Sequence, residues 1–387
     1  MTKRDYAADY WIGLRGNVAD SPPHRRVRRR GGEVNAVDNN ENIECTCGSE
    51  APADIKYRAL DFDGQAVVNG REIYGISTKW SLRDYLGEIM VRLDINRMNY
   101  AVKPGLYAVG RPGPGSQVVV SANYKLSFDV LRRELNGLNV WLLVLDTKGV
   151  NVWCAAGKGT FGTKELVRMV LDEKLAEIVS HKNIIIPQLG APGVSATLVQ
   201  MMSEFNVIYG PVRAEDLSIF IKNGMKADKA MRTVHFGLAD RMAVSLLDFV
   251  TAAKIGFIAS IILVLSAWRF PVFGRAALIL AIAMWCAIIT GSLLSAAALP
   301  FLPGRAFSVK GGVAGLIVSL VPVYMFKLGV FHALAVSVAI CAVSAYISVN
   351  FTGASTFTSL SGVRKELKYA IPSIIGLLVA AGALAVL

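Results

Sequence analysis

Apolar and polar positions along residues 51–230 alternate between two periods. Short apolar runs rich in Val, Ile and Leu predict buried strands, and runs with an apolar residue at every third or fourth position predict helices. Strands are expected over 117–123, 139–146, 183–189 and 206–212, with a short extended piece at 150–153. Helices are expected over 81–93, 125–135, 163–180 (with Thr163 as N-cap), after 190 and over 214–224. This alternation predicts a mainly parallel, Rossmann-like α/β sheet covered on both faces, and ligands of such sheets lie at the carboxyl ends of the strands.

The pattern changes after residue 250, where long apolar runs replace the alternation. Five runs have the length needed to cross the hydrocarbon core of a bilayer, near 252–268, 276–299, 311–329, 331–349 and 369–387. We therefore expect an all-α membrane domain of five transmembrane helices over 251–387. The remaining divisions are a disordered polar and basic arm over 1–50, the α/β domain over 51–235 and an amphipathic connector over 236–250.

The distribution of charge argues against nucleic acid as a partner and for a membrane. The net charge is +12, but residues 251–387 alone hold nine Lys and Arg side chains against one acid. Basic residues that flank apolar segments set the orientation of a membrane protein. The internal loops of an N-in arrangement would carry seven of the nearby Lys and Arg residues and the external loops three. This bias predicts a multi-pass protein of the cytoplasmic membrane, with the α/β domain in the cytoplasm and Leu387 outside.

The stretch NVWCAAGKGTFGT, residues 151–163, is the strongest candidate for chemistry. It follows a predicted strand, so it lies where ligands of such sheets bind. It lacks the spacing of a phosphate-binding P-loop, although Gly157, Gly159 and Gly162 match the dinucleotide pattern G-x-G-x-x-G. A cysteine hydrolase would need a histidine base, and the α/β region offers only His181 and His235. Cys154 could also be a buried packing residue, or a thiolate beside small residues that leave room for a large flat cofactor.

Four stretches together resemble a known family. NVWCAAGK (151–158) resembles the cap-helix signature of the corrinoid protein of two-component mercury-methylating systems, which joins a cytoplasmic corrinoid-binding domain to about five membrane helices. SANYKLSFDVLRREL (121–135), QLGAPGV (188–194) and YGPVRAEDL (209–217) are similar to the same domain and to its relative, the large subunit of the corrinoid iron–sulfur protein of acetyl-CoA synthesis. That relative has an N-terminal cysteine cluster, whereas this chain has only Cys45 and Cys47 before the domain.

The resemblance implies a base-off, cobalamin-type corrinoid as cofactor. Cys154 would be the lower axial ligand of the cobalt and the catalytic residue. The surrounding cap would be formed by Asn151, Val152, Trp153, Ala155, Ala156, Gly157 and Lys158. Ser121, Asn123 and Ser127 are candidates for polar contacts to the edge of the corrin ring, or alternatively for helix capping and turn hydrogen bonds.

The same resemblance implies a methyltransferase that passes a methyl group from methyl-cobalt(III) to mercury(II) and yields methylmercury. Mercury(II) is an electrophile, so an anionic thiolate opposite the methyl group would stabilise the electron-poor cobalt left behind. The implied partners are a ferredoxin-like protein with two 4Fe-4S clusters, which supplies electrons, and a methyl donor linked to methyl-tetrahydrofolate.

Two other functions remain open from the residues. One is a membrane-tethered corrinoid methyl carrier of folate-linked one-carbon metabolism. The other is a non-enzymatic membrane sensor or transporter whose α/β domain binds a small ligand. A weak or absent cobalt–sulfur bond would favour the first, and the absence of any bound corrinoid would favour the second.

Overall fold

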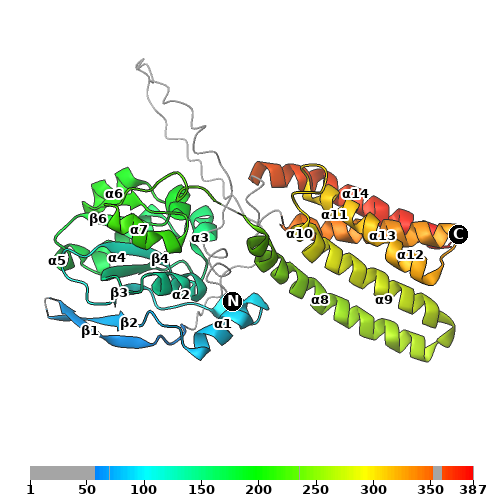
Figure 1. Cartoon of the computed structure of the whole chain (residues 1–387), viewed down its shortest axis with the longest axis horizontal. Coiled ribbons are helices and arrows are strands. Elements are labelled where there is room, and N and C mark those ends of the chain that lie inside the picture. Colours follow the sequence, from blue (N-terminus) through cyan, green and yellow to red (C-terminus); the bar gives the residue numbers. More distant parts are fainter. Residues whose placement is uncertain (1–56, 69, 235, 352–359, 387) are drawn as a thin grey trace, which may run out of the picture.

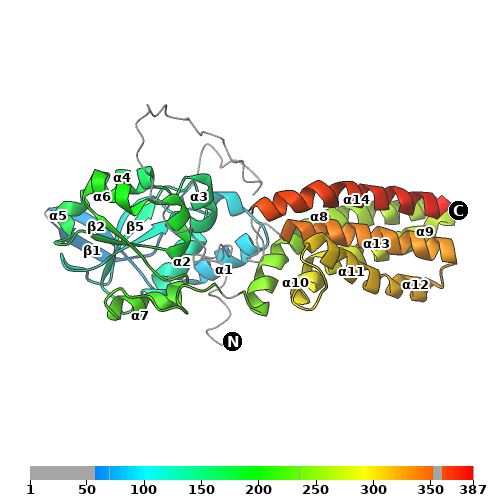
Figure 2. The same ribbon diagram turned by 90° about the horizontal axis from the view of Figure 1, so that it is seen from above.

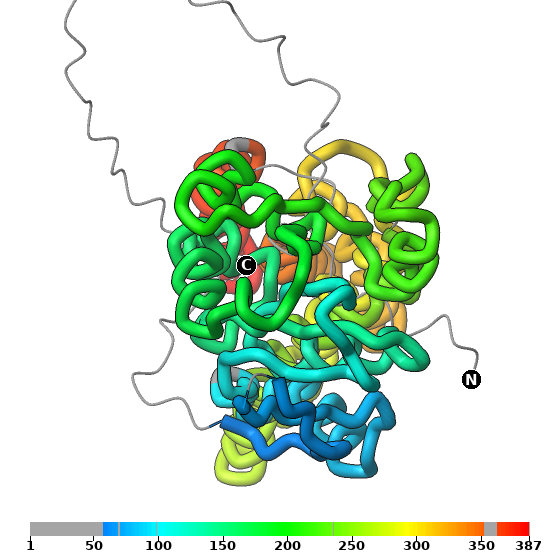
Figure 3. Tube along the Cα trace, turned by 90° about the vertical axis from the view of Figure 1, so that its left-hand side faces the viewer, coloured from blue at the N-terminus to red at the C-terminus, as the bar shows by residue number. Residues whose placement is uncertain are grey.

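The computed structural model describes residues 57–68, 70–234, 236–351 and 360–386. The predicted arm over 1–50, including Cys45 and Cys47, and His235 lie outside the described residues. The chain forms an α/β half and a bundle of long helices, side by side (Figures 1 and 2). Figure 3 views the molecule from the α/β end, with the bundle behind it.

A seven-stranded sheet forms the centre of the α/β half, in the order β1-β2-β3-β5-β4-β6-β7. The strands are β1 (Phe62–Val68), β2 (Arg71–Ile76), β3 (Gly105–Val109), β4 (Val118–Ala122), β5 (Val140–Leu145), β6 (Asn183–Ile186) and β7 (Asn206–Tyr209). β5, β4, β6 and β7 are mutually parallel, in register from Val118 opposite Trp141 and Ile184. β3 is antiparallel to β5, and β1 and β2 form an antiparallel hairpin, so the sheet is mixed.

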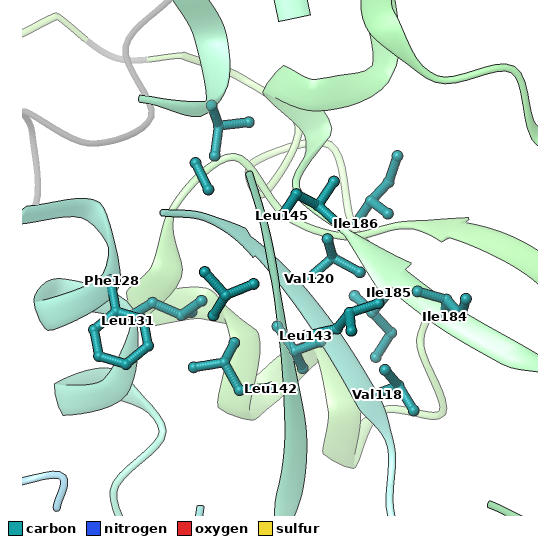
Figure 4. Packing of buried hydrophobic residues seen from close by; sticks show 14 of the residues in the cluster. Val118, Val120, Phe128, Leu131, Leu142, Leu143, Leu145, Ile184, Ile185 and Ile186 are labelled. Atoms are coloured by element: carbon teal, nitrogen blue, oxygen red, sulfur yellow. The ribbon is translucent and has the colours of Figure 1, made fainter. Parts of the chain in front are cut away.

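The helices of this half are short. They are α1 (Leu82–Arg92), α2 (Lys125–Glu134), α3 (Val152–Lys158), α4 (Thr163–Asp172), α5 (Leu175–Ile178), α6 (Ala196–Ser203) and α7 (Leu217–Lys222), with 3-10 turns η2 (Arg97–Asn99), η3 (Gln188–Gly193) and η4 (Ala214–Asp216). β4 and β5 are buried along their whole length, and their side chains pack with those of β6 and α2 into one core (Figure 4).

Two expectations about α4 were wrong. The helix expected over 163–180 ends at Asp172, because Lys174 adopts a left-handed conformation (φ 47°) that turns the chain before α5. Its N-cap is Gly162 rather than Thr163, whose hydroxyl instead accepts a hydrogen bond from the backbone N–H of Ser195 at 2.9 Å. This bond joins the start of α4 to the start of α6.

The second half of the chain is helical. Its elements are α8 (Leu238–Arg269), η5 (Pro271–Phe273), α9 (Gly274–Ile289), a π-helical turn η6 (Thr290–Leu294), α10 (Ser295–Ala297), α11 (Phe307–Val318), α12 (Leu320–Phe326), α13 (Val330–Asn350) and α14 (Leu360–Val386). Within the described residues, five helical segments are long and apolar enough to cross a membrane, in agreement with the number expected. α8 runs unbroken for 32 residues, so most of the segment expected as a connector belongs to the same helix as the first apolar run.

Small residues allow these helices to approach closely. A Cβ atom built on Gly311 or Gly315 of α11 would come within 3 Å of Ser344 or Ser348 of α13. Ser348 also donates a 2.8 Å hydrogen bond to the carbonyl of Gly291 in the π-helical turn. Packing of small residues combined with serine hydrogen bonds between helices is typical of bundles in lipid.

Candidate functional site

Cys154 lies in the first turn of α3, which follows β5 at the carboxyl edge of the parallel strands. The sequence pattern predicts an extended piece over 150–153, but the helix already begins at Val152. It begins there because Asn151 caps it: the side-chain oxygen accepts a 2.9 Å hydrogen bond from the backbone N–H of Cys154. It ends at Gly159, whose φ of 80° closes the last turn in a conformation that favours glycine.

The two faces of α3 differ. Val152, Ala155 and Ala156 are buried in the core. On the outer face, Cys154 is half-buried and Gly157 is exposed. Residues three apart are neighbours on a helix surface, so the thiol lies beside a stretch of backbone without side chain. A Cβ atom built on Gly157 would meet nothing within 4 Å, which leaves open space next to Cys154.

The inner face of α3 packs against the 3-10 turn η3. A Cβ atom on Gly193 would come within 3.1 Å of the Cα of Ala156, so only small residues on both sides permit this approach. The structure therefore brings together two of the stretches singled out from the sequence, 151–158 and 188–194. Ala156 serves this close packing and Ala155 is buried in the core, so neither lies on the outer face of α3.

Asn123 holds the loop that leads into α3. It follows β4, is fully buried, and its side-chain oxygen accepts hydrogen bonds from the backbone N–H of Thr147 (3.1 Å) and of Gly149 (2.9 Å). The Thr147 hydroxyl lies 2.8 Å from the same oxygen, and the Asn123 amide donates to the Asp146 carboxylate at 3.2 Å. Asn123 is thus a positioning residue that ties the end of β4 to the turn after β5.

The two serines of the predicted set are also buried. The hydroxyl of Ser121 donates to the carbonyl of Ala122 at 3.2 Å. The hydroxyl of Ser127, in the first turn of α2, is buried and has no hydrogen-bond partner in the described part of the chain. An unpaired buried hydroxyl is unusual in a protein, so Ser127 is the polar group of this region that a ligand or water molecule could still satisfy.

Tyr124 and Thr147 belong to this site but were not singled out from the sequence. Burial raises the pKa of Tyr124; Arg97 and Arg92 oppose that rise, and the nearby Cys154 adds to it. Tyr124 therefore stays neutral beside the thiol at physiological pH. The available signal was position alone: Tyr124 comes directly after Asn123, and Thr147 directly after Asp146, each of which follows a buried strand.

Two alternatives for the stretch 151–163 find no support among the described residues. His181 Nε2 lies 2.9 Å from the carbonyl oxygen of Ser116, just before the start of β4 and hence at the opposite end of the strand from Cys154. It cannot act as the base of a cysteine hydrolase. Gly157 lies within α3 and Gly159 ends it, so the glycine pattern is not the strand-to-helix loop that dinucleotide binding requires.

No group of three or more His, Cys, Asp or Glu side chains that could hold a metal ion occurs among the residues that the structure describes. Among the described residues of this site, the soft metal donor is the half-buried thiol of Cys154. A single thiolate suits a metal that brings its own equatorial ligands, as a macrocycle does, better than it suits a bare ion.

Comparison with known proteins finds relatives of the α/β half of the chain. Relatives named acetyl-CoA decarbonylase/synthase complex subunit gamma are 31% identical over 113 residues in Archaeoglobus fulgidus and 35% identical over 97 residues in Methanocaldococcus jannaschii. The aligned parts cover 29% and 24% of this chain and 24% and 20% of those relatives, so the chain spans about a quarter of their length. Residues 89–212, which include the whole candidate site, match the family described as the CO dehydrogenase/acetyl-CoA synthase delta subunit.

Proposed function

We propose that this chain is a membrane-anchored, corrinoid-dependent methyltransferase whose methyl acceptor is mercury(II). The observation that carries the proposal is the outer face of α3, where the Cys154 thiol lies beside the bare backbone of Gly157 at the carboxyl edge of the sheet. The match of residues 89–212 to an acetyl-CoA synthase subunit family supports a corrinoid as the ligand.

The residues present fit such a cofactor. A Cβ atom built on Gly157 meets nothing within 4 Å, so a flat macrocycle could approach the backbone there; Cys154 would supply a thiolate donor, and the unpaired buried hydroxyl of Ser127 would be available to bond a polar side group. Asn151, Trp153 and Lys158 would form the rest of the cap around the ring. Ser121 and Asn123 would support the site from beneath, through the strand end and the turn after β5.

A corrinoid, when bound, would supply a methyl group that an electrophile such as mercury(II) can accept only together with its bonding electrons. The protein contributes an anionic donor. Cys154 occupies the first turn of α3, where the partial positive charge of a helix N-terminus would favour thiolate over thiol. Asn151 fixes the position of Cys154 by accepting its backbone N–H, and the bonds of Asn123 fix the loop that carries Asn151.

Electrons and methyl groups must come from other proteins in this scheme. We propose a ferredoxin-like partner with two 4Fe-4S clusters as reductant and a methyl-tetrahydrofolate-linked donor as the source of methyl groups. The bundle would anchor the chain in the cytoplasmic membrane, with the α/β half inside. In support, Arg364, Lys365 and Lys368 lie at the start of α14, nearest the α/β half, whereas Arg269 and Arg275 lie at the far turn between α8 and α9 (Figure 1).

The test is Cys154→Ala in the full-length chain, loaded with methylcobalamin, with Cys286→Ala in the bundle as the matched cysteine control. The absorption spectrum should show that both variants retain corrinoid, and only Cys154→Ala should lose the spectral signature of a sulfur ligand. Methylation of mercury(II) should fall by orders of magnitude in Cys154→Ala, because each ~1.4 kcal/mol of lost transition-state stabilisation costs about tenfold in rate.

Three outcomes separate the alternatives. If Cys154→Ala methylates mercury(II) at the unsubstituted rate, the thiol is a packing residue. If the unsubstituted chain binds corrinoid without a sulfur ligand and passes methyl groups only to other acceptors, it is a one-carbon methyl carrier. If it retains no corrinoid, the site serves another ligand, as in a sensor or transporter.

A further inference from the structure

Helix α1 is oriented with its charged face inward. Its buried residues are Asp84, Glu88 and Val91, which recur at the spacing of one helix face. Asp84 accepts hydrogen bonds from Lys125 Nζ and from Arg132 Nη2, both at 2.6 Å. The Lys125 and Arg132 side chains of α2 are themselves buried, so water does not reach these ion pairs to replace either partner. The ion pairs therefore fix the acidic face of α1 against α2.

The opposite face of α1 is apolar and exposed, the reverse of a soluble amphipathic helix. We call it the apolar stripe. It consists of Leu82 (75% exposed), Tyr85, Leu86 (51%), Ile89 (53%), Met90 and Leu93. At 3.6 residues per turn these side chains span about 140° of the helix surface, centred opposite Asp84 and Glu88. The helix cannot rotate to bury the stripe without breaking the ion pairs.

The end of α1 lies beside the point on α8 after which its exposed side chains are apolar. Asp94, which follows α1, accepts a 3.3 Å hydrogen bond from Lys254 of α8. Immediately after Lys254, the side chains of Ile255, Phe257 and Ile258 are more than half exposed on α8. Both views place α1 at the edge of the α/β half nearest the bundle, beside the start of α8 (Figures 1 and 2).

We propose that the apolar stripe of α1 inserts into the surface of the same lipid bilayer that α8 crosses. The apolar surface of α8 beyond Lys254 and the apolar stripe then form one lipid-facing boundary, with the Asp94–Lys254 pair at the headgroup level. Arg83, exposed beside the stripe, reaches lipid phosphates there. This inference rests on the membrane placement of the bundle and is independent of the cofactor.

The test uses the full-length chain with its five cysteines replaced, reconstituted in phospholipid vesicles without any other protein. One cysteine is introduced at a time and labelled with an environment-sensitive fluorophore: Ile89→Cys in the stripe, Met201→Cys on α6 as an exposed apolar control (75% exposed), and Ile262→Cys within α8. Nitroxide groups on the lipids quench fluorophores that lie within the bilayer.

The proposal predicts blue-shifted emission and strong quenching by shallow nitroxides at residue 89, deep quenching at residue 262, and neither at residue 201. Quenching at 262 without quenching at 89 would show that the bundle spans the membrane but the stripe does not enter it, which overturns the proposal. The stripe would then be a docking site for another protein. A Leu86→Ser/Ile89→Ser variant, which leaves the buried face intact, should weaken attachment: a label on the neighbouring Leu82→Cys loses its quenching.

Discussion

Replacing Asn123 with alanine tests whether this residue holds the cap loop. The substitution removes the acceptor of two backbone N–H groups, one of them fully buried at Thr147 and one half-buried at Gly149. A buried donor without a partner costs about 1–3 kcal/mol. We therefore expect the free energy of unfolding to fall by about 2–4 kcal/mol, which corresponds to roughly 10 °C in the melting temperature of a domain of this size.

The matched control is Asn139→Ala. Asn139 is exposed, and its side chain accepts a single hydrogen bond, from the backbone N–H of Arg111 at 2.8 Å. Its loss should cost about 1 kcal/mol or less. Thermal unfolding of the full-length chain in detergent, followed by near-ultraviolet circular dichroism, measures both variants. An Asn123→Ala variant as stable as Asn139→Ala would refute the reasoning, and reduced corrinoid retention by Asn123→Ala would show that α3 depends on the loop.

Further predictions concern the packing of α3, the ion pairs of α1 and the orientation of the chain. Gly157→Ala should leave the melting temperature unchanged or raise it slightly, because the added methyl group enters open space. Gly193→Ala should lower the melting temperature, because its Cβ would lie 3.1 Å from the Cα of Ala156 and closer still to the carbonyl oxygen of Phe161. Burial acts to raise the pKa of Asp84, but Lys125, the Ser81 backbone and Arg132 outweigh it and hold that pKa at about 2. This depressed pKa contributes stability that is present above the ordinary value near 4 and is lost as the pH falls toward 2, and an Asp84→Asn variant should lack that acid-sensitive part of the profile. A reporter active only in the cytoplasm should be inactive when fused after Leu387, and an active fusion would reverse the proposed orientation.

Periodicity identified the elements that are buried on a regular face. β4, β5 and α2 were expected because their apolar residues recur at the spacing that burial requires. The β1–β2 hairpin was missed because most of β1 is exposed and its sequence, FDGQAVV, has no apolar run or strict alternation. Its position at the sheet edge removes the burial that produces the signal.

The cap helix was misread for a different reason. Val152 and Trp153 favour extended structure, and the glycines that follow suggest a loop, so local preference pointed away from a helix. Asn151 and Gly159 are its start and stop signals, and reading the capping residues would have identified it. The inverted face of α1 had no such signal, because a pattern of apolar positions does not tell which medium they meet.

The unbroken course of α8 has a consequence for how the two halves communicate. A 32-residue helix is about 48 Å long, and the part of α8 from Leu238 to Lys254 takes about 25 Å of it. That part is a rigid spacer that sets both the height of the α/β half above the lipid and the direction in which it faces. Inserting one residue before Lys254 would raise that half by only about 1.5 Å but turn it by about 100°. Inserting seven would nearly restore the direction while lifting α1 by about 10 Å, so height and facing can be varied separately.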